Sequence, residues 1–164
     1  MTDREALIRL NLTTDIGSVR LKKMLEHFGS VEDILEVGES QLLSLGVGQE
    51  LVGKISQARR ADVKREIERS EKSGIKIITF LDEEYPMQLN QIYSPPIVLY
   101  VMGRLDFDIG IGIVGSRRAS FYGLSSAEKI ARELSALGIT IISGLARGID
   151  TAAHRGALAA GGIT

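Results

Sequence analysis

The sequence predicts an α/β protein, in which a small all-helical domain precedes a parallel sheet. Through residues 1–73, apolar side chains recur at the spacing of amphipathic helices. All three prolines then fall within residues 81–96, a connector. From residue 109 onward, continuous apolar strands alternate with helices, which is typical of a doubly wound parallel sheet. We therefore predict a helical domain (1–73), a strand-containing connector (74–108) and an α/β domain (109–164).

The helical domain has readable start and stop signals. Gly29 is expected to end one helix and Ser30 to cap the next. A short helix follows over residues 40–45 and a long one over residues 49–73. The helix that ends at Gly29 is marked by apolar residues on one face: Val19, Leu21, Met24, Leu25 and Phe28.

The rest of the chain alternates between strands and helices. We expect strands at 75–80, 97–102, 109–114 and 139–142, a turn at 103–108, and helices at 122–137 and 151–159. Another strand begins near Ile163, and we therefore expect the α/β domain to be truncated, with its further strands in a longer protein.

Composition excludes several kinds of function. With 20 basic and 21 acidic side chains, the chain has no overall attraction for a polyanion, so nucleic-acid binding would need a local basic cluster. Cysteine is absent and only two histidines occur, so we expect no disulfide, metal or cofactor. The chain shows neither a signal peptide nor an apolar run of about 20 residues, which predicts a cytoplasmic location away from membranes.

The loop after the strand at 109–114 has the groups that bind an anion. Gly115 allows a close backbone approach and a positive φ, and Ser116 offers a hydroxyl. Arg117 and Arg118 supply guanidinium groups suited to phosphate, next to the amino end of a helix. The alternative is a tight turn that happens to carry two surface arginines.

A second loop of this kind follows the strand at 139–142. It contains Ser143, Gly144, Arg147, Gly148 and Asp150. Because parallel strands end at the same edge of a sheet, the two loops should be neighbours and their arginines should form one phosphate pocket. We expect Asp150 to cap its own helix.

His154 follows Asp150 by one helical turn. We expect it to be a packed histidine that is hydrogen-bonded to Asp150, in preference to a catalytic or metal-binding residue.

A glycine motif of the dinucleotide-binding type occurs in the sequence, but its position argues against a nicotinamide site. Gly110, Gly112 and Gly115 match the spacing of a dinucleotide-binding loop, but the first two lie inside the strand. The next strand ends in Ile142-Ser143, without the acidic residue that would bind a ribose.

These loops resemble those of the DNA-processing protein A family (DprA/Smf). The similarity rests on Gly-Ile-Val-Gly-Ser-Arg-Arg-Ala-Ser-Phe-Tyr-Gly at 112–123 and Ser-Gly-Leu-Ala-Arg-Gly-Ile-Asp-Thr-Ala-Ala-His at 143–154. The segments Tyr-Pro-Met-Gln-Leu at 85–89 and Pro-Ile-Val-Leu-Tyr at 96–100 are also similar. The resemblance extends over roughly residues 10–164.

The resemblance implies a Rossmann-like domain that binds single-stranded DNA and delivers it to the RecA recombinase during natural transformation. It implies phosphate contacts from Gly115, Ser116 and Arg117 in the first loop. In the second loop it implies them from Ser143, Gly144, Arg147, Gly148 and Asp150. A homodimer is implied for the full-length protein, through a helix beyond Thr164.

The helical domain has a candidate site of its own. Gly46-Val47-Gly48 resembles the turn of a helix-hairpin-helix, in which backbone N–H groups contact a DNA phosphate. The same turn fits a sterile-alpha-motif-like (SAM-like) protein-interaction domain equally well, and both alternatives stay open.

Two further functions remain as alternatives to non-catalytic DNA binding. One is a nucleotide-binding hydrolase like the cytokinin-activating phosphoribohydrolases, although their Pro-Gly-Gly-x-Gly-Thr loop has no counterpart here. The other is a protein-interaction module.

Overall fold

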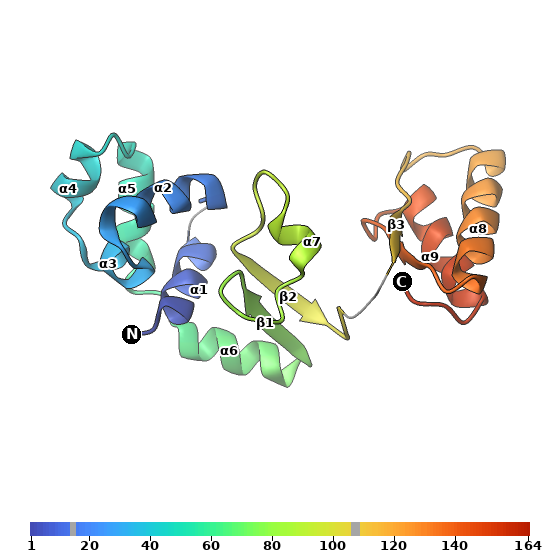
Figure 1. Ribbon diagram of the computed structural model, residues 1–164, viewed down its shortest axis with the longest axis horizontal. Coiled ribbons are helices and arrows are strands. Elements are labelled where there is room, and N and C mark those ends of the chain that lie inside the picture. Colours follow the sequence, from blue (N-terminus) through green and yellow to red (C-terminus); the bar gives the residue numbers. More distant parts are fainter. Residues whose placement is uncertain (14–15, 106–108) are drawn as a thin grey trace. The chain divides into compact units, whose positions relative to one another are not determined.

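The computed structural model describes residues 1–13, 16–105 and 109–164. The chain divides into two compact units, Met1–Leu105 and Asp106–Thr164, which we call the first and the second unit (Figure 1). The predicted division into a helical domain (1–73), a connector (74–108) and an α/β domain (109–164) stays a prediction. Part of the turn expected at 103–108 lies outside the described residues.

Helices build most of the first unit. They are α1 (Asp3–Thr13), α2 (Ser18–Phe28), α3 (Val31–Glu36), α4 (Glu39–Ser44), α5 (Gln49–Ala58) and α6 (Val63–Lys72). Their apolar faces form one core, in which Leu7, Leu21 and Ile55 are fully buried. The predicted cap is confirmed, because the hydroxyl of Ser30 accepts a hydrogen bond from the backbone N–H of Asp33 at the start of α3.

The prediction of one long helix over residues 49–73 is wrong. The chain leaves the helix after Ala58, and Asp62 caps α6 by accepting the N–H of Arg65. Arg9 of α1 stabilises the break, since its guanidinium group donates to the carbonyl oxygens of Arg59 (2.7 Å) and Ala61 (2.8 Å). Two helices therefore pack where one was expected.

The two strands of the connector pair with each other. β1 (Ile75–Thr79) and β2 (Val98–Met102) are antiparallel, with Ile77 opposite Tyr100. Ile77 and Val98 belong to the core of the helices, and the short helix α7 (Met87–Asn90) lies in the loop between the strands. This hairpin is therefore part of the first unit and forms a sheet separate from the parallel one.

A partly buried hydrogen-bond network around Asp82 ties β1 to α1. The carboxylate of Asp82 accepts hydrogen bonds from the N–H and the hydroxyl of Thr79, and Arg4 lies 3.4 Å from it. Burial alone would raise the pKa of Asp82, but the hydrogen bonds from Thr79 and the charge of Arg4 outweigh burial and lower this pKa. The charged carboxylate therefore stabilises the fold.

We expect Asp82→Asn to lower the free energy of unfolding by about 1 kcal/mol at neutral pH, the typical value of one hydrogen bond. Because the pKa is lower in the folded state, this stabilisation is present above the pKa of the unfolded chain and is lost as the pH falls through the folded pKa. Urea unfolding of both proteins at neutral and at acidic pH measures the difference. A gap that stays constant down to pH 2 would contradict this explanation.

The second unit is a βαβα arrangement. β3 (Gly110–Gly112), α8 (Phe121–Ala136), β4 (Thr140–Ile142) and α9 (Ile149–Ala159) follow one another. β3 and β4 are parallel, with Ile111 opposite Ile141. The N–H of Ile141 also donates to the carbonyl oxygen of Ile163, where a further strand was expected. The predicted fold class, a helical part followed by a Rossmann-like parallel sheet, is confirmed.

Small residues bring α8 and α9 together over the sheet. Ala131 and Ala153 are fully buried between them, with Ile141 of β4 below. At Gly156, an added Cβ atom would lie 2.2 Å from the backbone oxygen of Glu128, so only glycine permits this approach. In the described residues, no helix is long and apolar enough to cross a membrane.

Candidate functional site

A groove of about 770 Å³ runs between α8 and α9 from the loops that precede them. Its lining is rich in basic side chains: Arg117, Arg118, Lys129, Arg132, Arg147 and Arg155. Glu128 is the acidic residue of this lining. The groove therefore carries an excess of positive charge, although the whole chain is close to neutral.

The predicted convergence of arginines is present in the structure. Arg117 and Arg118 come from the first loop and Arg147 from the second, and all three line the groove. They are exposed, and no carboxylate within the described part of the chain pairs with them. Unpaired guanidinium groups that converge in this way suit the oxygens of a phosphate.

The two loops are held together at Gly148. The N–H of Ile149 donates to the carbonyl oxygen of Ser116 (3.2 Å), which joins the second loop to the first. Gly148 has a φ of 87°, and an added Cβ atom there would lie 2.2 Å from the same oxygen. Only glycine satisfies both conditions, so Gly148 fixes the distance between the arginine-bearing loops.

Gly115 has a different role from the one predicted. It does not adopt a positive φ, which in these loops belongs to Gly148 and to Leu145. An added Cβ atom at Gly115 would lie 2.7 Å from a side-chain carbon of Ile149. Gly115 therefore makes room for Ile149, which packs the start of α9 against the first loop.

The expectation that Asp150 caps its own helix is wrong. Gly148 occupies the cap position, and the buried carboxylate of Asp150 accepts the N–H groups of Gly144 (3.1 Å) and Ala146 (3.4 Å). Gly144 leaves room for that carboxylate, because an added Cβ atom would lie 2.8 Å from its oxygen. Asp150 thus braces the second loop from within.

Hydroxyl groups complete the bracing of both loops. Ser143 donates to the carbonyl oxygen of Ile113 at 2.6 Å, and Thr151 donates to that of Ala146 at 2.7 Å. The hydroxyl of Ser116 accepts the N–H of Arg118 at 3.1 Å. Of the predicted site residues, Arg117, Arg118, Arg147 and Gly148 line the groove, whereas Gly115, Ser116, Ser143, Gly144 and Asp150 position them.

His154 does not bond to Asp150 as expected. Its Nδ1 atom lies 2.7 Å from the hydroxyl of Thr164, which in turn donates to the carbonyl oxygen of Ile141. The carboxylate of Asp150 is turned toward the loop instead. No group of three potential metal-ligating side chains occurs in the described residues, and a metal-independent site stays a prediction.

Sequence reasoning missed the basic residues on the helices. Lys129 and Arg132 lie on the groove side of α8, and Arg155 lies on that of α9. The signal was available, because Lys129 and Arg132 are three positions apart and so share a helix face. Arg155 could be placed only once the packing of α8 against α9 was known.

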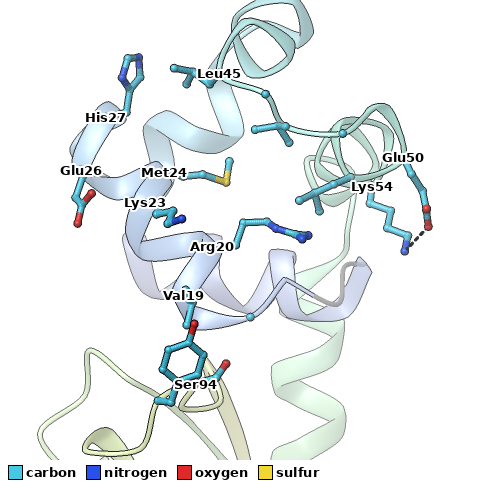
Figure 2. A pocket seen from close by; sticks show the side chains of 16 residues that line it. Val19, Arg20, Lys23, Met24, Glu26, His27, Leu45, Glu50, Lys54 and Ser94 are labelled. Atoms are coloured by element: carbon cyan, nitrogen blue, oxygen red, sulfur yellow. Dashed lines mark ion pairs between the residues drawn. The ribbon is translucent and has the colours of Figure 1, made fainter.

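A second cavity, of about 1140 Å³, lies in the first unit. The glycine turn at Gly46 and Gly48 lines it, together with Arg20 and Lys23 of α2. Figure 2 shows Arg20 reaching into this cavity, while Glu50 and Lys54 pair with each other at 2.9 Å. Gly46 has a φ of 76°, as expected in a tight turn.

Comparison with known proteins identifies the family. Residues 76–164 match the family model "DNA recombination-mediator protein A". Protein Smf of Synechocystis sp. is 35% identical over 161 residues, which cover 91% of this chain and 39% of that protein. The DNA processing protein DprA of Streptococcus pneumoniae is 44% identical over 88 residues, which cover 52% of this chain and 31% of that protein.

A solved structure agrees with the sequence matches. The X-ray structure of DNA processing protein A from Streptococcus pneumoniae matches with a TM-score of 0.70 and 28% identity, over 99% of this chain and 56% of that one. The chain therefore belongs to the DNA recombination-mediator protein A family, as its loops had indicated, and it spans less than two thirds of the length of these relatives. Proteins of this family are named for DNA processing and recombination.

Proposed function

We propose that this protein binds single-stranded DNA through its phosphate backbone, in the groove between α8 and α9, without catalysing a reaction. The observation that carries the proposal is the convergence of Arg117, Arg118 and Arg147 on one groove, all exposed and free of acidic partners in the described residues. The positive charge and the braced glycine loops offer a preformed surface for a polyanion.

The groove favours a flexible single strand over a duplex. A single strand can bend its phosphates into a recess between two helices, which a stiff double helix cannot do. Phosphates carry no base information, so we expect little sequence preference. The aromatic side chains near the loops, Phe121 and Tyr122, are both exposed, and only Phe121 lines the groove, where it could stack on a base.

We further propose that the whole protein acts in the cytoplasm and delivers the strand to the RecA recombinase during natural transformation, and that the full-length protein forms a homodimer. Support for these steps comes from the family resemblance and from the matched relatives, which are named DNA processing proteins.

The test is a titration of fluorescent oligo(dT) with the wild type and with Arg117→Ala. Loss of one charged contact should weaken binding about tenfold, the equivalent of about 1.4 kcal/mol. Arg65→Ala, which removes an exposed arginine from α6, serves as the control. Equal affinity of all three proteins would refute the site. Release of a free nucleobase from a nucleoside monophosphate incubated with the wild type would favour the hydrolase.

The glycine turn of the first unit is proposed as a second contact with the DNA backbone. The cavity favours it, because the basic side chains of Arg20 and Lys23 line the same cavity as the turn. Gly48 has a φ of −62° and open space around its Cα atom, so a glutamate there can be accommodated without strain.

Gly48→Glu should therefore weaken oligonucleotide binding severalfold by placing a carboxylate in the cavity, with the fold unchanged. Gly53→Glu is a matched control, since Gly53 is also exposed and unobstructed but lies outside this cavity. Unchanged affinity in Gly48→Glu would leave the protein-interaction function as the explanation of the turn.

A further inference from the structure

The groove between α8 and α9 is longer than one phosphate requires. Its lining extends from Gly148, which caps α9, to Arg155 on α9, and these seven residue steps span about 10 Å at a rise of 1.5 Å per residue. Both helices follow parallel strands through short loops, so both begin at the loop end of the groove. Arg132 and Arg155 therefore lie at the far end, away from Arg117 and Arg147.

Charge continues along the whole groove. Arg132 and Arg155 are exposed, and no carboxylate in the described residues pairs with either of them. Lys129 lies 3.9 Å from Glu133, a weak surface pair that leaves its charge available. A phosphate held by the loop arginines cannot also reach the far end, so only a ligand with several phosphates can contact both ends of the groove at once.

We propose that the bound single strand continues from the loops along the groove between α8 and α9, where Arg132 and Arg155 bind phosphates further along the same strand. This inference rests on the proposed function and adds the path that the strand follows over the surface of the second unit. A stacked strand carries one charge about every 3.4 Å, so about 10 Å of groove accommodates about three successive phosphates. The ligand class is therefore an oligonucleotide, and a mononucleotide would contact the loop end alone.

Glu128 provides a second, independent test of the proposal. It lines the groove between the two ends, where its carboxylate repels a passing phosphate. Removing that charge should strengthen binding, an effect opposite in sign to any loss caused by damage to the fold.

The experiment compares the double variant Arg132→Gln/Arg155→Gln with Glu128→Gln and with the control Arg65→Gln/Arg69→Gln on α6. Each is titrated with a twelve-nucleotide oligo(dT) at several salt concentrations and with a 5′-phosphorylated dinucleotide. The groove variant should lose at least tenfold in affinity for the longer strand. Its negative slope of log K against log salt should become less steep by about 1.4, or 0.7 per lost contact. Its affinity for the dinucleotide should stay unchanged, and Glu128→Gln should bind the longer strand at least twofold tighter.

The outcomes separate this proposal from the function on which it rests. If Arg117→Ala weakens binding but the groove variant matches the control, the strand leaves the loops by another path and this inference is overturned while the function stands. If the wild type binds neither ligand, both are overturned. Amide proton spectra that match the wild type show that each variant is folded.

Discussion

Replacing Gly148 with alanine should remove oligonucleotide binding and destabilise the second unit. A methyl group there meets two costs, because the backbone has a φ of 87° and the new Cβ atom would lie 2.2 Å from the carbonyl oxygen of Ser116. The backbone conformation of Gly148, with φ 87° and ψ −128°, costs alanine at least about 1 kcal/mol and the steric overlap about 2 kcal/mol more, so we expect a loss of at least about 3 kcal/mol. Relief of the overlap would move the two loops apart and separate Arg117 from Arg147.

Hydrogen exchange of the α9 amides measures this loss within the second unit, and an oligo(dT) titration measures binding. Gly138→Ala is the matched control. Gly138 also has a positive φ, 81°, but nothing lies within 4 Å of the Cβ position. This variant should lose only about 1 kcal/mol and keep its affinity. Equal effects of the two substitutions would show that close contact between the loops is unimportant.

Gly156→Ala should have the second-largest effect, through the packing of α8 against α9. The added Cβ atom would lie 2.2 Å from the backbone oxygen of Glu128 and 3.0 Å from the Cβ atom of Ala131. Both neighbours belong to a packed helix, so α9 must move away. We expect a loss of about 2 kcal/mol, even though alanine favours a helix by up to about 1 kcal/mol over glycine.

The control for this substitution is Gly123→Ala on α8. The nearest atoms to the Cβ position of Gly123 are 3.6 Å away, an ordinary contact distance. Exchange of the α8 and α9 amides should therefore be unchanged or slower in Gly123→Ala and faster in Gly156→Ala. Faster exchange in both variants would mean that glycine is needed in these helices for a reason other than close packing.

Local signals in the sequence were sufficient for much of the fold. The cap at Ser30 and the parallel pairing of the strands after residue 109 follow from short-range chemistry and from the period of apolar residues. The break after Ala58 depends on Arg9, which lies about 50 positions earlier, so helical periodicity alone could not reveal it. The capping residue Asp62 was nevertheless a readable sign of a new helix.

The candidate site was predictable in position but not in the role of each residue. Two loops at the carboxyl ends of parallel strands must be neighbours, which is why Arg117 and Arg147 could be placed together. The roles of Gly115 and Asp150 depend on contacts made by Ile149 and by the N–H of Gly144, and these contacts arise only when the loops pack. The helical arginines were missed because their groove is created by the tertiary packing of α8 against α9.

The most direct measurement is a map of backbone amide chemical shifts during titration of the protein with oligo(dT). Binding in the groove predicts the largest changes at Arg117, Arg118, Arg147, Gly148 and Thr151, with smaller ones toward Arg155, and a weaker response as salt is raised. Changes confined to the other face of the second unit, or an absence of changes at millimolar DNA in low salt, would contradict the account.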